Sequence, residues 1–405
     1  MTDLIPRARR QLGVSIDRPD VSTLTNLDRV HASIYKDPEI FEMESERIFH
    51  KTWIFVAHTS EIPNPGDWKN THIGRQPVIA SRREDGGVSV MLNRCRHRGT
   101  TVCEGRLGHS KRFRCPYHAW VYDGSDGRLV GVPYKQGYDD GFCVEELGLI
   151  HVARVDEYCG LIFASLDHDV VDLPEYLGNV KPYIEEFFGQ GAGRQLKVTP
   201  GINQNVYPGN WKFQLENSMD NYHVPVVHKI FMDNRHGTTS YPPNDTRRTR
   251  DLGGGHGALY RKAFSDEPTD DTPTGFNALI FPSLVIINVQ LRVIYPLDVN
   301  HTKVELLPLI IDGASDEENA KRMRLHEDFF GPAGFGTPDD AEAVMRRTPL
   351  GMQADTGDDW VYFARGVTTD EPEEGGVLAG AVTYETAQRG FYKGWREYMV
   401  GEDLR

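Results

Sequence analysis

Two short pairs of cysteine and histidine, placed close together, constrain the fold of this chain more than any other feature. Cys95 and His97 form a Cys-x-His motif, Cys115 and His118 form a Cys-x-x-His motif, and only residues 98–114 separate them. The segment contains glycine and proline, which mark turns. We therefore expect two loops that project from a sheet and present thiolate and imidazole ligands to one metal centre.

The ligand set fits two kinds of centre. One is a [2Fe–2S] cluster in which two histidines replace two cysteines on one iron, and the other is a structural zinc site. Zinc sites usually group like ligands, whereas each loop here supplies one cysteine and one histidine. This spacing favours the iron–sulfur cluster, with zinc as the alternative. Cys103 and His109 lack the spacing, and we interpret them as loop or core residues.

The composition argues against a nucleic-acid partner and against a disulfide framework. The 405 residues suffice for two or three domains. Lysine and arginine number 45 against 59 aspartate and glutamate, which gives a net charge of −14 and no basic footprint for a phosphate backbone. The five cysteines are an odd number, as expected in a reducing compartment. A local basic stretch, Lys111, Arg112 and Arg114, still offers a site for an acidic protein.

Neither a targeting signal nor a membrane helix is expected. The first twenty residues include basic residues but no apolar stretch of a signal peptide, so we expect a cytoplasmic protein. The most apolar long window, 278–297, contains Pro282, Arg292 and Pro296. A membrane-spanning helix rarely tolerates these residues together, so the window predicts buried strands.

Three regions differ in pattern along the chain. Asp37 followed by Pro38 predicts the start of a helix through residue 49. From Trp53 to Asp167, short β-rich runs alternate with turn residues, which predicts a small all-β domain around the cluster motifs. Beyond residue 168, helix signals mix with alternating runs such as NVQLRVIYP at 288–296, which predicts a sheet with helices against it.

A second group of ligand-type residues lies in GNWKFQLENSMDNYHVPVVH at 209–228. His223 and His228, with a carboxylate from elsewhere, would form the facial triad of a non-haem Fe(II) site that is open to O₂. On an ideal helix their rings would point about 140° apart. Pro225 lies between them and disfavours a regular helix, so we expect a distortion that brings them together. From these residues alone, two ordinary packed histidines are the simpler interpretation.

The motifs CRHRG at 95–99 and CPYHAW at 115–120 closely resemble the Rieske cluster signature of the large (α) subunits of aromatic-ring-hydroxylating oxygenases. The resemblance also covers the following segments, and so most of the chain: SEIPNPGDW at 60–68, GNWK at 209–212, GPAGF at 331–335 and ETAQRGFYKGW at 385–395.

The resemblance implies an α+β protein. An all-β Rieske [2Fe–2S] domain, 52–168, is inserted in a helix-grip-like catalytic domain of antiparallel sheet and helices, made of 1–51 and 169–405. It implies that Cys95, His97, Cys115 and His118 bind the cluster. It also implies that His223 and His228 bind one mononuclear Fe(II).

The third iron ligand is inferred from GPAGFGTPDDAEAV at 331–344, which resembles the family segment that supplies it. The second of the adjacent acids, Asp340, falls where the ligand is expected, and Asp339 is the runner-up. Thr337 stands where the family usually has glutamate. Thr337 as an N-cap, with Pro338 and two acids in the first turn, would equally describe an ordinary helix start. More distant alternatives are Asp355, Asp358 and Asp359.

Asp220 is expected to support the iron site. It precedes His223 by one helical turn and can accept a hydrogen bond from that ring. The resemblance implies that it also bridges to His118 of a neighbouring subunit in a trimer, which makes it the expected catalytic residue beyond the ligands. An ordinary carboxylate at a helix end is the alternative. Asn217 and Trp211 match the family segment, but packing and capping explain them.

By resemblance, the chain is the terminal oxygenase component of a multicomponent system that uses O₂ to hydroxylate or cis-dihydroxylate an aromatic ring. The resemblance implies a small β subunit in an α₃β₃ assembly, or an α₃ trimer. Because the chain has no nucleotide or flavin fingerprint, electrons must come from a reductase or ferredoxin that uses NAD(P)H. A Rieske electron-transfer protein and a zinc-binding module are the alternatives from other classes.

The substrate is expected to be a monocyclic aromatic acid, such as salicylate, benzoate or terephthalate. This expectation rests on the resemblance of GVPYKQGY at 131–138 and on the compact catalytic half. Arg292 can pair with a substrate carboxylate if it faces the cavity, although a structural arginine is equally consistent. Polycyclic or neutral hydrocarbons are the alternative substrates, and oxidative demethylation is the alternative reaction.

Overall fold

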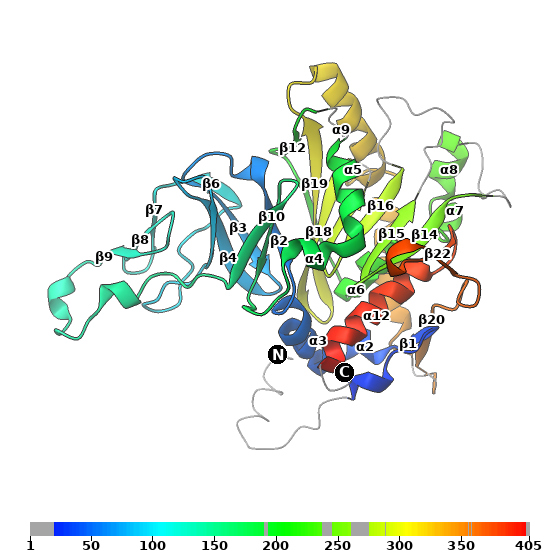
Figure 1. Ribbon diagram of the computed structural model, residues 1–405, viewed down its shortest axis with the longest axis horizontal. Coiled ribbons are helices and arrows are strands. Elements are labelled where there is room, and N and C mark those ends of the chain that lie inside the picture. The colour runs from blue at the N-terminus through cyan, green and yellow to red at the C-terminus, as the bar shows by residue number, and fades with distance from the viewer. Residues whose placement is uncertain are drawn as a thin grey trace.

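The computed structural model shows a β-rich lobe joined to a larger part built around one long sheet (Figure 1). The structure describes residues 20–189, 193–236, 245–260, 275–287, 289–354, 356–357 and 359–401.

The β-rich lobe contains three small antiparallel sheets whose strands, between residues 54 and 165, pair only with one another. Their orders are β10-β11-β2, β5-β4-β3-β6 and β7-β8-β9. The strands are β2 (Ile54–His58), β3 (Asp67–Ile73), β4 (Gln76–Arg82), β5 (Val88–Leu92), β6 (Leu107–His109), β7 (Arg112–Arg114), β8 (Val121–Asp123), β9 (Leu129–Gly131), β10 (Arg154–Tyr158) and β11 (Leu161–Ser165).

The larger part is built on a ten-stranded antiparallel sheet of order β12-β19-β18-β17-β16-β15-β14-β22-β21, with β13 also paired to β19. Consecutive strands from β14 to β19 are neighbours, so most connections are short hairpins. The strands are β12 (Leu196–Val198), β13 (Asn203–Tyr207), β14 (Arg248–Gly253), β15 (His256–Tyr260), β16 (Phe276–Ile280), β17 (Leu284–Ile287), β18 (Gln290–Asp298), β19 (His301–Ile311), β21 (Glu371–Pro372) and β22 (Leu378–Ala381). Separately, β1 (Arg29–His31) pairs with β20 (Trp360–Tyr362).

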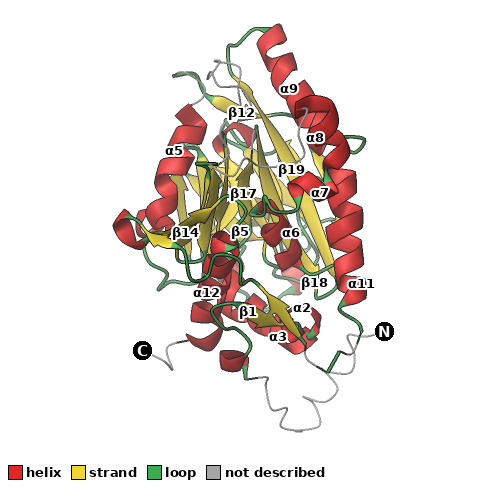
Figure 2. Cartoon of the chain, turned by 90° about the vertical axis from the view of Figure 1, so that its right-hand side faces the viewer, coloured by secondary structure: helices red, strands yellow, loops and turns green. Residues whose placement is uncertain are grey.

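Helices cover both faces of the long sheet (Figure 2). The α-helices are α2 (Ser33–Lys36), α3 (Pro38–Glu44), α4 (Leu173–Leu177), α5 (Lys181–Gly189), α6 (Trp211–Ser218), α7 (Val224–Val227), α8 (Lys229–His236), α9 (Asp316–Phe330), α10 (Thr337–Asp340), α11 (Arg347–Gly351) and α12 (Thr386–Val400). Two π-helical segments are η2 (Ser45–Phe49) and η7 (Ala341–Arg346). Short 3₁₀ turns are η1 (Val21–Thr23), η3 (Thr59–Glu61), η4 (Lys135–Gly137), η5 (Val144–Glu146), η6 (Gly178–Val180) and η8 (Glu374–Gly376).

The two faces of the sheet contact different helices because successive side chains of a strand point to opposite sides. Ala278 and Ile280 of β16 pack in a core with Ile184 of α5. Leu279, between them, packs in a second core with Trp395 of α12. Both faces are therefore buried, which explains why 276–297 is apolar almost throughout.

The structure confirms the α+β fold class, with an all-β lobe and a part of mixed helix and antiparallel sheet. The apolar window 278–297 forms parts of β16, β17 and β18, as predicted. The Asp37 carboxylate accepts hydrogen bonds from the backbone N–H groups of Glu39 and Ile40, and so caps the predicted helix. Among the residues that the structure describes, no helix has the length and apolarity needed to cross a bilayer.

A buried carboxylate joins three helices that are far apart in sequence. Glu44, at the end of α3, accepts hydrogen bonds from Trp211 Nε1 at 2.8 Å, from Trp395 Nε1 at 2.7 Å and from Lys212 Nζ. The side chains of Glu44 and Lys212 are fully buried. Burial lowers the pKa of Lys212, and the Glu44 carboxylate opposes this effect. Because α6 leads directly into the segment with His223 and His228, this network positions the second predicted metal site.

Replacing Glu44 with alanine should lower the free energy of unfolding by about 3–5 kcal/mol, because Lys212 would remain buried without its partner. Urea unfolding followed by circular dichroism measures the change. The control is Glu42→Ala, which removes an exposed pair with Arg75 and should change stability by about 1 kcal/mol or less. A Glu44→Gln, Lys212→Met double variant should be less destabilised than Glu44→Ala. Equal effects of Glu44→Ala and Glu42→Ala would contradict the assigned role of Glu44.

Candidate functional site

The two predicted cluster loops have the same backbone design. The first lies between β5 and β6, where the Gly99 N–H donates to the Cys95 carbonyl at 2.9 Å. The second lies between β7 and β8, where the Ala119 N–H donates to the Cys115 carbonyl at 3.0 Å. Gly99 and Ala119 both have positive φ, of 79° and 57°, which tightens each turn. Each cysteine therefore begins a closed turn that also contains its histidine.

Side chains of the β-rich lobe hold these loops in place. The amide oxygen of Asn93 accepts hydrogen bonds from the backbone N–H groups of Val102 and Cys103, and its nitrogen donates to the Cys103 carbonyl. The Tyr122 hydroxyl lies 3.2 Å from Cys95 Sγ and accepts a hydrogen bond from the Arg96 N–H. Cys103 is thus a buried structural residue, as predicted, and His109 pairs with Asp67 at the surface.

The four predicted ligands lie together at the end of the lobe. The Cys95 and Cys115 side chains are buried, and burial raises the pKa of the Cys115 thiol. The rings of His97 and His118 have centroids 4.5 Å apart, and Trp120 stacks on His97 at 4.9 Å. The Nδ1 atoms of both histidines are buried without a hydrogen-bond partner. Such orphaned nitrogens beside two thiols fit a metal centre, because buried polar atoms are otherwise paired.

The geometry distinguishes a two-iron cluster from zinc. A tetrahedral zinc holds its four ligand atoms within about 4 Å of one another. A single ion can be shared by three or more histidine, cysteine, aspartate or glutamate side chains whose ligand atoms lie within 4.8 Å of one another. Among the described residues, only His223, His228 and Asp340 meet this condition. The ligand atoms of the four predicted cluster residues are therefore too far apart to bind a single zinc ion. This is expected for ligands that divide between two irons.

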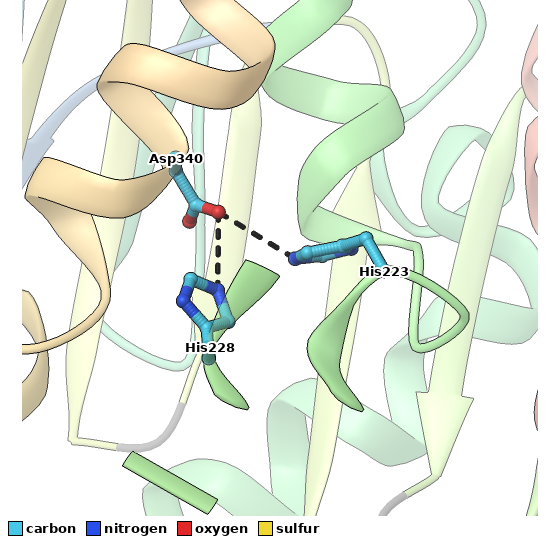
Figure 3. Close-up of side chains that lie close together, drawn as sticks. All are labelled: His223, His228 and Asp340. Carbon is cyan, nitrogen blue, oxygen red and sulfur yellow. Dashed lines mark ion pairs between the residues drawn. The ribbon is translucent and has the colours of Figure 1, made fainter. Parts of the chain in front are cut away.

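His223, His228 and Asp340 converge from two separate segments (Figure 3). The oxygen Oδ1 of Asp340 lies 3.1 Å from His228 Nε2 and 3.5 Å from His223 Nε2. His223 precedes the four-residue helix α7 and His228 follows it, with Pro225 in its first turn. The expected distortion therefore takes the form of a break after α6 and a very short helix between the two histidines. Imidazole nitrogens and a carboxylate oxygen at one point fit a non-haem Fe(II) site.

None of the other described acids that the sequence left open belongs to this convergent group. Asp339 is 44% exposed and approaches the opposite nitrogen of His228, Nδ1, at 3.5 Å. Asp359 pairs with Lys36 at 3.0 Å, while Asp355 and Asp358 lie outside the described residues. The helix α10 begins at Thr337 with Gly336 as N-cap, so the prediction of Thr337 as N-cap was wrong by one residue. The Thr337 hydroxyl instead donates to the Phe330 carbonyl at 3.0 Å.

Two polar residues of the α6–α7 segment contact the metal-site side chains. Asp220 Oδ2 lies 3.4 Å from His223 Nδ1, long for a hydrogen bond, and Oδ1 accepts from the Tyr222 and His223 backbone N–H groups. Asn217 Nδ2 lies 3.3 Å from His223 Nε2 and donates to Asp340 Oδ1 at 3.2 Å. Sequence analysis explained Asn217 by packing or capping and missed this bridge. The position of Asn217, three residues before Asp220, was the sequence signal that could have indicated this contact.

Electrostatics explain why these side chains stay together. Burial lowers the pKa of His223, but the carboxylates of Asp220 and Asp340 outweigh this effect and raise the pKa to about 9. Burial raises the pKa of Asp340, and the two histidines reverse this, so that its pKa lies well below the usual range. Asp340 therefore stays ionised at neutral pH, in the form in which a carboxylate binds a metal ion.

A cavity of about 600 Å³ opens beside Asp340. Its walls include Leu306 and Phe330, and its polar side chains include Gln214 and Arg292. A cavity of this volume, lined by apolar and polar side chains together, can hold a small organic ligand. A larger hollow of about 940 Å³ between α5 and β14 contains none of the predicted metal ligands.

Two protein-family models and several known proteins match this chain. Residues 52–149 match the family model of the Rieske [2Fe-2S] domain, and residues 190–401 match that of the ring hydroxylating alpha subunit catalytic domain. The chain is 34% identical to the anthranilate 1,2-dioxygenase large subunit of Acinetobacter baylyi, over 84% of this chain and 80% of that protein. It is also 34% identical to the 2-halobenzoate 1,2-dioxygenase large subunit of Burkholderia cepacia, over 78% of this chain and 75% of that protein.

The fold also resembles a solved structure. Naphthalene 1,2-dioxygenase with indole bound in the active site superposes with a TM-score of 0.85 at 25% identity, over 96% of this chain and 95% of that chain. The similarity therefore includes both the β-rich lobe and the larger part.

Replacing Asp340 with alanine should remove the mononuclear iron and leave the visible spectrum of the [2Fe–2S] cluster intact. Asp339→Ala is the matched control and should keep both metals, because its side chain lies outside the convergent group. Iron and acid-labile sulfide analysis of the two variants measures the outcome. If only the Asp339→Ala variant lost its iron, the third ligand would be Asp339 and not Asp340.

Proposed function

The chain belongs to the family of ring-hydroxylating oxygenase α subunits, and from this membership we propose that its substrate is a monocyclic aromatic carboxylic acid. As a member, it is the terminal oxygenase component, an oxidoreductase with one Rieske [2Fe–2S] cluster and one mononuclear iron. The relatives named for anthranilate and 2-halobenzoate support an aromatic acid.

One observation carries the proposal: Arg292 and Asp340 line the same cavity. Arg292 lies on β18, is 5% exposed, and donates from Nη1 to Ser218 Oγ at 3.0 Å. Its guanidinium lies 5.5 Å from the ring centroid of Phe330, which also lines the cavity. A buried arginine binds a carboxylate strongly, because little water competes for either charge. The substrate carboxylate would then contact Arg292, with the ring between it and the iron ligands.

The residues that hold the metals are assigned as part of this proposal. Cys95, His97, Cys115 and His118 hold the [2Fe–2S] cluster, and His223, His228 and Asp340 hold the iron. When bound, these groups supply electron transfer and O₂ activation for the oxygenation of an aromatic ring. Asn217 keeps the Asp340 carboxylate in position through its hydrogen bond. The apolar wall of the cavity orients the ring and excludes water.

The assembly is proposed to be a trimer in which neighbouring subunits share a catalytic unit. Within one chain, the loops at β7–β8 and the segment at α7 lie at opposite ends of the molecule (Figure 1). We therefore place His118 of one subunit near Asp220 of the next. Asp220 would hold the His223 ring and connect it to the neighbouring cluster. A small β subunit, giving α₃β₃ rather than α₃, and a donor that uses NAD(P)H complete the proposed system.

Two further assignments follow from the same membership. The division into a Rieske domain at 52–168 and a catalytic domain at 1–51 and 169–405 is supported by the strand pairing, because β1 pairs with β20 across the inserted lobe. A cytoplasmic location is supported by five cysteines that are free, one of them exposed.

Replacing Arg292 with methionine should raise KM for a benzoate-type acid by about 10–100-fold, which corresponds to about 1.4–3 kcal/mol of lost binding. Methionine keeps much of the side-chain length and removes the charge. Steady-state oxygen uptake measures the change. Turnover of neutral naphthalene should be unaffected or improved.

The control is Arg322→Met, which replaces another buried arginine that donates to the Leu309 carbonyl and does not line the cavity. Equal losses for the acid and for naphthalene would show that Arg292 supports the fold and does not recognise a carboxylate.

Replacing Asp220 with asparagine should preserve both metals and slow the reoxidation of the reduced cluster in a single turnover with O₂ and substrate. The amide keeps the size but loses the charge and acceptor capacity that hold the His223 ring. Stopped-flow absorbance measures the rate, and Asp339→Asn, beside the other histidine, is the control. An unchanged reoxidation rate in Asp220→Asn would exclude the proposed connection.

A further inference from the structure

Three exposed cations lie on, or directly before, the strand that leads to a predicted cluster ligand. Lys111, Arg112 and Arg114 are exposed, and we call them the β7 basic face. Phe113, between the two arginines, points into the lobe and is 3% exposed, in a core that also contains Cys115. The alternation of a strand therefore turns both arginines outward together.

Among the described residues, no carboxylate forms an ion pair with the β7 basic face, whereas cations close to it in sequence do form ion pairs. His109 pairs with Asp67 at 2.9 Å, and Arg128 pairs with Asp126 at 2.6 Å. Arg112 stands opposite Asp123 in the strand register, but the Asp123 carboxylate accepts hydrogen bonds from the backbone N–H and hydroxyl of Ser125. Lys111, Arg112 and Arg114 therefore form a local excess of positive charge on a chain with a net charge of −14.

The face lies close to the cluster on its cysteine side. Arg114 directly precedes Cys115, whose thiol is buried, while His97 and His118 are only half-buried. A partner on β7 would therefore reach the cluster through the Cys115 backbone. The histidine side would stay available to a neighbouring catalytic site.

The charge distribution within the lobe orients such a partner. The segment that follows β9 is acidic and exposed, with Asp139, Asp140, Glu145 and Glu146. The sheet order β7-β8-β9 puts β7 at one edge and the strand leading to this acidic segment at the other. A negatively charged protein would be attracted to the β7 edge and repelled from the β9 edge.

We propose that the β7 basic face, Lys111, Arg112 and Arg114, docks an acidic electron-donor protein that reduces the [2Fe–2S] cluster. The proposal rests on the proposed function, because it assumes a bound cluster and an external donor. One electron leaves the reduced donor, which is oxidised, and enters the cluster, which is reduced; no bond forms or breaks. The attraction acts on the association rate and weakens as salt screens it.

The test uses the full-length holoenzyme and a plant-type [2Fe–2S] ferredoxin of strongly negative charge as the donor. Stopped-flow absorbance without aromatic substrate gives the second-order rate constant for cluster reduction. A Lys111→Glu, Arg112→Glu, Arg114→Glu variant should lower this constant about tenfold or more at low salt and flatten its salt dependence. Reduction by dithionite should be unchanged. Ferredoxin affinity, measured by microscale thermophoresis, should fall in parallel.

The matched control is Arg324→Glu, Lys393→Glu, Arg396→Glu, which makes the same charge change at exposed positions of α9 and α12 in the larger part. Equal slowing in both triple variants would show a net-charge effect and overturn the proposal. Loss of the native oligomer only in the β7 variant would instead assign the face to a contact between copies of the chain. Because no aromatic substrate is present, failure of the proposed substrate class would leave these rates unchanged.

Discussion

The buried carboxylate of Glu44 is the interaction on which the catalytic part depends. It accepts hydrogen bonds from two tryptophans and one lysine on α6 and α12, although Glu44 precedes the β-rich lobe in the sequence. Isolated charges are expensive to bury, so the ion pair is stable only when every partner is in place. The Glu44 network therefore links α3 to α6 and α12. The α6 helix ends at Ser218. Asn217, in its last turn, and Asp220, just beyond its end, both approach the His223 ring.

The two proposed metal sites are built on different principles. The loops proposed to hold the cluster are turns closed by backbone hydrogen bonds on two small sheets, and their ligands come from one short stretch of sequence. The proposed iron site combines a broken helix with a carboxylate from α10, more than one hundred residues later. In the first site, local backbone geometry sets the ligand positions. In the second, the packing of α6, α7 and α10 sets them, so that distant substitutions such as those at Glu44 can affect iron binding.

The surface of the β-rich lobe and the cavity of the larger part both present positively charged side chains. Arg292 brings a buried positive charge to a cavity that also contains the anionic Asp340. The β7 basic face brings exposed positive charge to a chain with an excess of acids. The first charge can select a small anion at short range because little water surrounds it. The second acts at longer range and is sensitive to salt, as suits a transient protein partner.

Sequence alone determined the features whose signals are local. The Cys-x-His and Cys-x-x-His motifs, the Asp37 cap, the β-rich middle and the apolar window each depend on neighbouring residues, and the structure confirms the cap and the strands. The resemblance favoured Asp340 over Asp339, and the tertiary structure brings Asp340 to the two histidines, because a one-residue difference on a helix turns a side chain by about 100°. It also decided that Asn217 bridges His223 and Asp340 and that Arg292 shares their cavity. Such contacts between residues far apart in the chain depend on how helices and strands pack, which no local pattern records.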